Sequence, residues 1–199
     1  ISMSWGGRGS PSTFELEVIQ FAHDQGAAIC AASGNDGANA DDHYPSAYPH
    51  VLSVTNVEIS DQHVSVANFG YSVDVAAHGQ GIVSTVPNQG IAPSSGTSMS
   101  APFVAAACAL VKTRWPSYTA DQVMQRVRVT SDNIDGINPE FAGLLGYGRV
   151  NVLDALTRNT PAIRISDIQI TDQDGDGIVE KGETVTLDVA VTNLLARAQ

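Results

Sequence analysis

Basic residues are scarce in this chain of 199 residues, which has 10 Lys and Arg against 21 Asp and Glu and a formal charge of −11. A surface this acidic repels phosphate backbones, so the composition argues against a nucleic-acid partner. Long apolar runs are absent too, because no stretch approaches the roughly 20 residues that a membrane-spanning helix needs, and we expect no membrane contact. The content of 43% apolar and 16% charged residues is typical of a globular protein.

Cysteine is also rare: the chain has Cys30 and Cys108, and each lies in an apolar stretch, AAICAAS and VAAACALV. This setting favours two buried thiols that behave as small hydrophobic groups. Their spacing gives no argument for a disulfide, although a disulfide stays open as the alternative.

The hydrophobic pattern predicts an α/β fold. Residues 27–32 form a continuous apolar run between Gly26 and the turn residues Ser33, Gly34 and Asn35. Such a run is typical of a strand that is buried on both faces of a parallel sheet. Further strands are expected at residues 1–5, 51–57, 64–69, 73–76 and 82–85.

Helix signals alternate with these strands. Ser12 with Glu15, and Thr119 with Gln122, have the spacing of capping boxes, in which side chains satisfy free N–H groups at a helix start. The segment 98–114 is apolar around most of its circumference, which is typical of a buried helix. The expected helices are residues 12–25, 98–114, 119–129 and 151–156.

The character of the chain changes near residue 159, so we expect one domain over residues 1–158 and the start of a β-rich module over residues 159–199. Strands at 165–170 and 184–191 flank an acidic loop that fits the calcium pattern D-x-D-x-D-G-x5-E. This spacing suits the oxygen ligands of Ca²⁺, and the alternative is a solvated acidic hairpin. The predicted ligands are Asp172, Asp174, Asp176, Ile178 and Glu183.

Two short motifs point to chemistry. Ser98 lies in SSGTSMSAP at the start of the predicted buried helix, where unpaired N–H groups favour a nearby oxyanion. Asn35 lies in AASGNDG just beyond a predicted strand, where a carboxamide N–H can stabilise a developing negative charge. Taken singly, the first motif is more often a helix cap and the second more often a plain turn.

Together these segments resemble the subtilisin-like (S8) serine protease family. GTSMSAP is similar to the family's nucleophile motif, AASGNDG to the stretch with its oxyanion asparagine, and ISMSWGG to a cleft-lining strand. The similarity continues in order over about residues 1–156. It implies the C-terminal half of a doubly wound parallel α/β sheet, followed here by a short β extension. It also implies a serine endopeptidase that acts on proteins or peptides outside the cell or at the cell envelope.

The resemblance also implies site residues. Carried over by position, Ser98 is the nucleophile and Asn35 is the oxyanion donor, and His43 belongs to a loop near the specificity pocket. The residues implied to line the substrate cleft are Ser4, Trp5, Gly6, Ala32, Ser33, Gly34 and Thr97.

The activating partners of the serine are not recognisable in this sequence. The family's triad runs in the order Asp, His, Ser, and no matching Asp or His motif precedes Ser98. We interpret the five histidines as surface or loop residues. A serine without a base is a poor nucleophile, so we expect this chain alone to be an incomplete, inactive part of a protease.

Two further expectations follow. The alternative function is a non-catalytic fragment that binds peptides in its cleft and carries a calcium-stabilised β module. In either case, strands missing from a parallel sheet would leave an open edge, through which we expect the chain to self-associate.

Overall fold

The structure is a computed structural model that describes residues 1–88 and 90–195. Contacts within the chain divide it into two compact units, Ile1–Asn159 and the segment from Thr160 onward. The assignment of residues 159–199 to a separate β-rich module stays a prediction. Among the described helices, none combines the length and apolar character that a membrane crossing requires.

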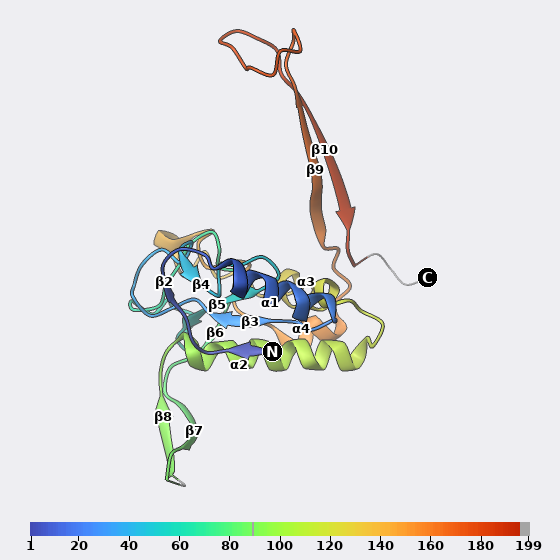
Figure 1. The fold of residues 1–199 in the computed structure, drawn as a ribbon. Coiled ribbons are helices and arrows are strands. Elements are labelled where there is room, and N and C mark those ends of the chain that lie inside the picture. Colours follow the sequence, from blue (N-terminus) through green and yellow to red (C-terminus); the bar gives the residue numbers. More distant parts are fainter. Residues whose placement is uncertain (89, 196–199) are drawn as a thin grey trace. The chain divides into compact units, whose positions relative to one another are not determined.

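The first unit is built on a four-stranded parallel sheet in the order β1-β3-β5-β6 (Figure 1). Side chains along β3 and the residue before it alternate between the two faces of the sheet, as strand geometry requires. Cys30 and Ala32 join the hydrophobic core on one face, and Ile29 and Ala31 join the core on the other. The strands are β1 (Ser2–Met3), β3 (Cys30–Ala32), β5 (Leu52–Val57) and β6 (Val75–His78).

Helices cover both faces of this sheet. The helix α1 (Thr13–Asp24) packs through Ile19 and Leu16 on one face, and Figure 1 shows α2 on the opposite side. The expected α/β fold with a parallel sheet between helices is therefore confirmed. The elements on the second side are α2 (Thr97–Arg114), α3 (Ala120–Val129) and α4 (Val152–Thr157), and a 3-10 turn η1 (Pro139–Phe141) follows α3 in the chain.

The helix α2 is not buried on all sides, so that expectation is wrong. Val104 and Val111 are fully buried in the core, whereas Phe103 and Leu110 are each 48% exposed. One side of α2 packs on the sheet, and no described residue covers the other side.

Two short pairings were not expected from the sequence, and one expected strand is absent. The antiparallel pairs are β2 (Gly7–Arg8) with β4 (His43–Tyr44), and β7 (Ile82–Val86) with β8 (Gly90–Ser94). Residues 64–69, expected as a strand, form turns instead. The backbone there is bent by turn hydrogen bonds, such as that from Ala67 N–H to the Val64 carbonyl.

The two cysteines lie against each other in the core. Cys30 Sγ on β3 and Cys108 Sγ on α2 are 3.9 Å apart, and both residues are buried free thiols. The contact with Cys108, together with burial, raises the pKa of the Cys30 thiol. Neutral thiols in this position contribute to packing between the central strand and the long helix.

The second unit is an antiparallel hairpin of β9 (Ile163–Thr171) and β10 (Thr186–Asn193), with a register shift between Ala190 and Val191. Every residue of both strands is exposed. The acidic loop joins the two strands (Figure 1).

Candidate active site

Three segments of the first unit meet at the carboxyl edge of the parallel sheet. The strands β1 and β3 are parallel neighbours, so their carboxyl ends lie at the same edge, and α2 begins at that same end (Figure 1). They enclose a cleft of about 460 Å³. Of the catalytic and cleft residues expected from the sequence, those that line this cleft are Ser4, Trp5, Gly6, Ala32, Gly34, Asn35, Thr97 and Ser98.

Ser98 lies in the first turn of α2, where N–H groups have no acceptor within the helix. Its hydroxyl donates to the backbone carbonyl of Ser4 at 3.1 Å, and the Ser4 hydroxyl donates to the Ser98 carbonyl at 2.7 Å. Within the described residues, no histidine or carboxylate makes a hydrogen bond to the Ser98 hydroxyl. The hydrogen bonds that hold Ser98 in the cleft thus involve main-chain carbonyls, and no base contacts its hydroxyl among the described residues.

Asn35 follows β3 and is connected to the start of the helix that carries Ser98. Its Oδ1 accepts hydrogen bonds from Thr97 N–H at 2.9 Å and from the Thr97 hydroxyl at 3.2 Å. Because these bonds occupy the amide oxygen, the NH₂ group is the part of the side chain left for a ligand in the cleft. No described residue accepts a hydrogen bond from it.

Two glycines, Gly34 and Gly96, give Asn35 the space to lie against the start of α2. Gly34 has φ of +103°, and a Cβ there would lie 2.4 Å from Asn68 Nδ2. Gly96 has φ of +142°, and a Cβ there would lie 3.2 Å from Asn35 Oδ1. Both φ values favour glycine. A side chain at Gly96 would push Asn35 away from the start of α2, and one at Gly34 would press on Asn68 and His43.

Asn68, which sequence reasoning missed, holds the Asn35 loop from behind. It is fully buried; its Oδ1 accepts from Asp36 N–H at 2.9 Å and Ala38 N–H at 3.2 Å, and its Nδ2 donates to the Ser33 carbonyl at 2.9 Å. Its backbone N–H also donates to the Gly34 carbonyl at 3.0 Å. One side chain therefore fixes the backbone on both sides of Asn35.

The surroundings of Ser33 and His43 differ from those expected from the sequence. Ser33 does not line the cleft but is fully buried behind it, and its carbonyl accepts from Asn68. His43, expected as a loop or surface histidine, is buried on β4 and lines the cleft beside Gly6, Gly7 and Arg8. Burial lowers the pKa of His43, and its Nδ1 contacts the Ser46 hydroxyl at 3.1 Å rather than Ser98.

In the second unit, the acidic loop brings three predicted ligands together. Asp172, Asp174 and Asp176 offer oxygens that lie within 4.8 Å of one another, which is close enough to hold a metal ion. Glu183 instead accepts hydrogen bonds from backbone N–H groups of the loop, including Gln173 at 2.7 Å. The Ile178 N–H donates to Asp176 at 2.7 Å, which leaves the Ile178 carbonyl as the group predicted to bind the ion.

Comparisons with known proteins agree with this geometry. Residues 1–148 match the Subtilase family, and the chain belongs to this family of subtilisin-like serine peptidases. It is 36% identical to a thermostable alkaline protease of Halalkalibacterium halodurans over 149 residues, which are 75% of this chain and 41% of the relative. It is 34% identical to Subtilisin BL of Lederbergia lenta over 152 residues, which are 76% of this chain and 54% of that protein.

A solved structure shares the fold. A protease from Pseudoalteromonas arctica superposes with a TM-score of 0.72 at 29% identity, covering 77% of this chain and 49% of that one. The chain thus spans about half the length of the relatives that it matches.

Proposed function

We propose that this protein is a serine endopeptidase, or part of one, that hydrolyses peptide bonds through an acyl-enzyme on Ser98 with Asn35 as an oxyanion donor. The observation that supports this most is the pair of hydrogen bonds from Thr97 to Asn35 Oδ1, which leaves the Asn35 NH₂ group for the cleft. Family membership supports the reaction class. It is also our basis for proposing protein or peptide substrates and a location outside the cell or at the cell envelope.

The chemistry assigned to each group follows from its place in the cleft. Ser98 Oγ attacks the carbonyl carbon of the peptide bond, and its proton passes to a general base. The carbonyl oxygen gains negative charge, which the Asn35 N–H and the positive N-terminus of α2 stabilise. The amine then leaves with a proton from the base, and water hydrolyses the ester. The exposed residues 4–6 after β1 give an extended substrate a backbone segment to pair with.

We propose that the base comes from residues other than those described, and that this chain alone has little peptidase activity. A fluorophosphonate probe tests this, because it reacts with an activated serine. We expect negligible labelling of the chain alone. We expect rapid labelling of a longer polypeptide that also carries the family's aspartate and histidine segments. Mass spectrometry of the labelled peptide should place the probe on Ser98.

The variant Ser98→Ala in the longer polypeptide is the control, and it should abolish labelling. Equal labelling of both polypeptides would contradict the need for an outside base. Absence of labelling in both would instead favour the alternative function, in which the cleft binds peptides without cleaving them.

We propose that the acidic loop holds Ca²⁺ through Asp172, Asp174, Asp176, the Ile178 carbonyl and Glu183. Desolvation within the loop opposes ionisation of Asp172, but hydrogen bonds led by that from Gly177 N–H lower its pKa. The backbone N–H of Glu180, followed by those of other loop residues, lowers the pKa of Glu183. Both carboxylates are therefore ionised at neutral pH, as ligands of a hard cation must be.

Calorimetric titration with Ca²⁺ should show one site per chain, and Asp174→Asn should weaken it at least about tenfold, because one of the charged oxygens is lost. Affinity should stay constant between about pH 6 and pH 8, well above ordinary carboxylate pKa values. Asp188→Asn, on the exposed strand β10, is the matched control and should leave binding unchanged. No heat at millimolar Ca²⁺ would refute the site.

We also propose self-association through the edge at β1. Among the described strands, β1 pairs with β3 alone, and Ile1 and Trp5 beside it are more than half exposed. Light scattering coupled to size-exclusion chromatography should give a mass above that of one chain that rises with concentration. Trp5→Lys should shift the equilibrium toward the monomer. A wild-type chain that stays monomeric at every concentration would contradict the proposal.

A further inference from the structure

A second cluster of ionisable side chains lies in the first unit, away from the cleft. It consists of His23 in the last turn of α1, His50 in the turn before β5, and Asp121 in the first turn of α3. Each side chain offers one ligand atom, and the three atoms lie within 4.8 Å of one another. The motifs that carry Ser98 and Asn35 do not include any of the three residues, and the proposed peptidase chemistry does not use them.

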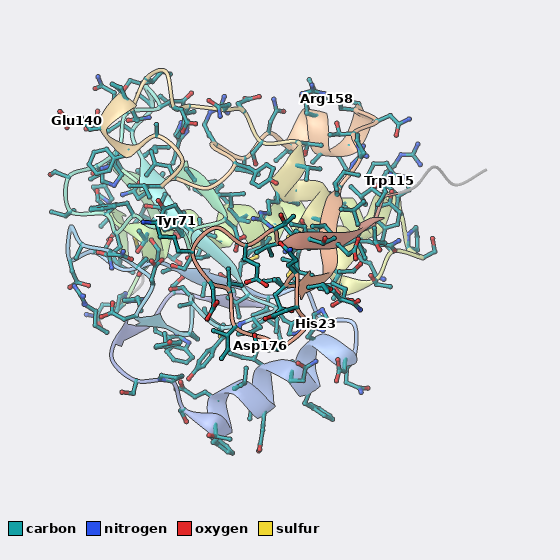
Figure 2. The ribbon with its side chains drawn as sticks, turned by 90° about the horizontal axis from the view of Figure 1, so that it is seen from above. His23, Tyr71, Trp115, Glu140, Arg158 and Asp176 are labelled. Carbon is teal, nitrogen blue, oxygen red and sulfur yellow. The ribbon has the colours of Figure 1, made fainter. Side chains whose placement is uncertain are left out.

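The cluster lies at the edge of the sheet opposite the cleft. His23 precedes β3 and His50 precedes β5, so both lie at the amino ends of parallel strands, whereas the cleft follows the carboxyl ends. Figure 2 shows His23 near the C-terminal end of α1. A ligand held here would therefore not contact Ser98 or Asn35.

The distances suit a metal ion with nitrogen and oxygen ligands. His23 Nε2 is 3.2 Å from Asp121 Oδ1, and His50 Nδ1 is 4.0 Å from the same oxygen. Tetrahedral coordination with bonds of about 2.0–2.1 Å places neighbouring donors roughly 3.4 Å apart. The centroids of the two imidazole rings are 4.0 Å apart with 32° between the ring planes, so the rings lie against each other, and side-chain rotation is needed to direct both toward one ion beside Asp121.

The ring nitrogens of His23 lack the partners that a purely structural histidine has. The side chain is 11% exposed, and both nitrogens are shielded from solvent without a hydrogen bond to any described residue. Nε2 is close enough to Asp121 for a hydrogen bond but is not aligned for one. This arrangement is expected where the His23 nitrogen and the Asp121 oxygen both face the position of a bound metal ion. Leaving these polar atoms without partners lowers the stability of the fold, and a bound cation would remove this cost.

The second nitrogen of His23 also has surroundings typical of a metal ligand. Its Nδ1 is 3.5 Å from Asp24 Oδ1. Histidines that bind metals commonly direct their other ring nitrogen toward a carboxylate, which fixes the tautomer and orients the ring. Asp24 is placed to do this while Nε2 faces Asp121.

A hydrogen bond also joins α1 to the segment that leads to His50. The Tyr48 hydroxyl, two residues before His50, donates to Glu15 on α1 at 3.0 Å. His50 itself has φ of +64° and lies just before β5. The turn and α1 are thus joined through Tyr48 near the start of α1, and the ligand cluster lies at the other end of that helix.

We propose that His23, His50 and Asp121 bind one divalent first-row transition metal ion, with Zn²⁺ as the ion to test and water completing the coordination. Two imidazole nitrogens and one carboxylate suit Zn²⁺, whereas Ca²⁺ prefers oxygen ligands alone. The ion joins α1, the turn before β5, and α3. Of these elements, α1 and α3 pack on opposite faces of the sheet. Its role is to stabilise the first unit at the edge remote from the cleft.

Calorimetric titration with Zn²⁺, in excess Ca²⁺ to occupy the acidic loop, tests the proposal. We expect one Zn²⁺ per chain, a higher thermal midpoint with Zn²⁺, and d–d absorption typical of tetrahedral coordination when Co²⁺ replaces Zn²⁺. His23→Gln should weaken binding more than tenfold, since it removes a direct ligand. Asp24→Asn changes only the orienting carboxylate and should weaken Zn²⁺ binding by no more than about 100-fold.

Two further variants separate loss of the site from loss of the fold. Asp121→Asn changes a side chain that is 43% exposed, so it should keep the fold while weakening Zn²⁺ binding more than tenfold. His78→Gln is the matched control: His78 also faces a carboxylate, Asp61, at 3.4 Å but has no third ligand beside it among the described residues. Absence of saturable Zn²⁺ binding overturns the proposal, as does wild-type affinity in both His23→Gln and Asp121→Asn.

Discussion

Asn68→Ala is expected to lower the free energy of unfolding by about 3 kcal/mol, because it leaves one buried C=O group and two partly buried N–H groups without their partner. A buried group without a partner costs about 1–3 kcal/mol. The groups are the N–H of Asp36, the N–H of Ala38 and the carbonyl of Ser33. For a chain of this size, the thermal midpoint should fall by roughly 6–12 °C. Denaturant unfolding gives the free energy, and calorimetry gives the midpoint.

The same variant should loosen the loop that carries Asn35. We expect faster amide hydrogen exchange over residues 34–38, because the lost hydrogen bonds belong to the loop. Exchange in the buried strand β5 should rise only by the factor that the loss of global stability sets. Asn39→Ala is the matched control: it makes the same deletion in the same loop but removes one exposed bond, from Asp41 N–H to Asn39 Oδ1. If Asn68→Ala were as mild as Asn39→Ala, the role of Asn68 in fixing the loop would be wrong.

The sheet, its helices and the nucleophile segment could be predicted because their signals are local. The apolar run before Ser33 and the capping residue Thr119 mark their elements from within a few positions, and the structure has a strand and a helix there. The meeting of Asn35 with Ser98 is a tertiary contact. It was accessible only because family resemblance supplied a fold in which parallel strands end at one edge.

Asn68 and the metal-ligand cluster could not be predicted because their chemistry depends on burial. Asn68 falls in a segment that the sequence predicts as a strand, and a single asparagine there gives no sign of a special role. Its importance comes from being fully enclosed beneath residues 33–38, which are distant in the sequence. His23, His50 and Asp121 come from three segments with no spacing motif, so nothing in the sequence marks them as neighbours.

The wrong expectations about residues 64–69 and α2 have a related cause. Valines at alternate positions favour a strand, but hydrogen bonds within the segment, such as that from Ala67 N–H to the Val64 carbonyl, bend its backbone into turns. An apolar helix surface predicts burial without specifying what covers it. In α2, the sheet covers one side, and Phe103 and Leu110 stay exposed on the other.

Asn35→Ala, made in the longer polypeptide with a complete triad, is expected to lower kcat for peptide hydrolysis by about 10²–10³, equivalent to about 2.7–4 kcal/mol. That range is the one measured for an oxyanion donor of subtilisin itself, and we adopt it unchanged because the chain belongs to the same family. In the proposed role, the Asn35 NH₂ group binds negative charge that develops fully only as the transition state forms. The loss should therefore fall on kcat and on kcat/KM equally, with KM nearly unchanged.

Asn39→Ala again serves as the control, because it shortens an asparagine of the same loop without touching the cleft, and its kcat should equal that of the unaltered protein. Asn35→Asp should be at least as damaging as Asn35→Ala. It keeps an oxygen that accepts from Thr97 but replaces the N–H donor with negative charge beside the developing oxyanion. A rise in KM with kcat preserved in Asn35→Ala would mean that Asn35 binds the substrate rather than the transition state, and the oxyanion assignment would fail.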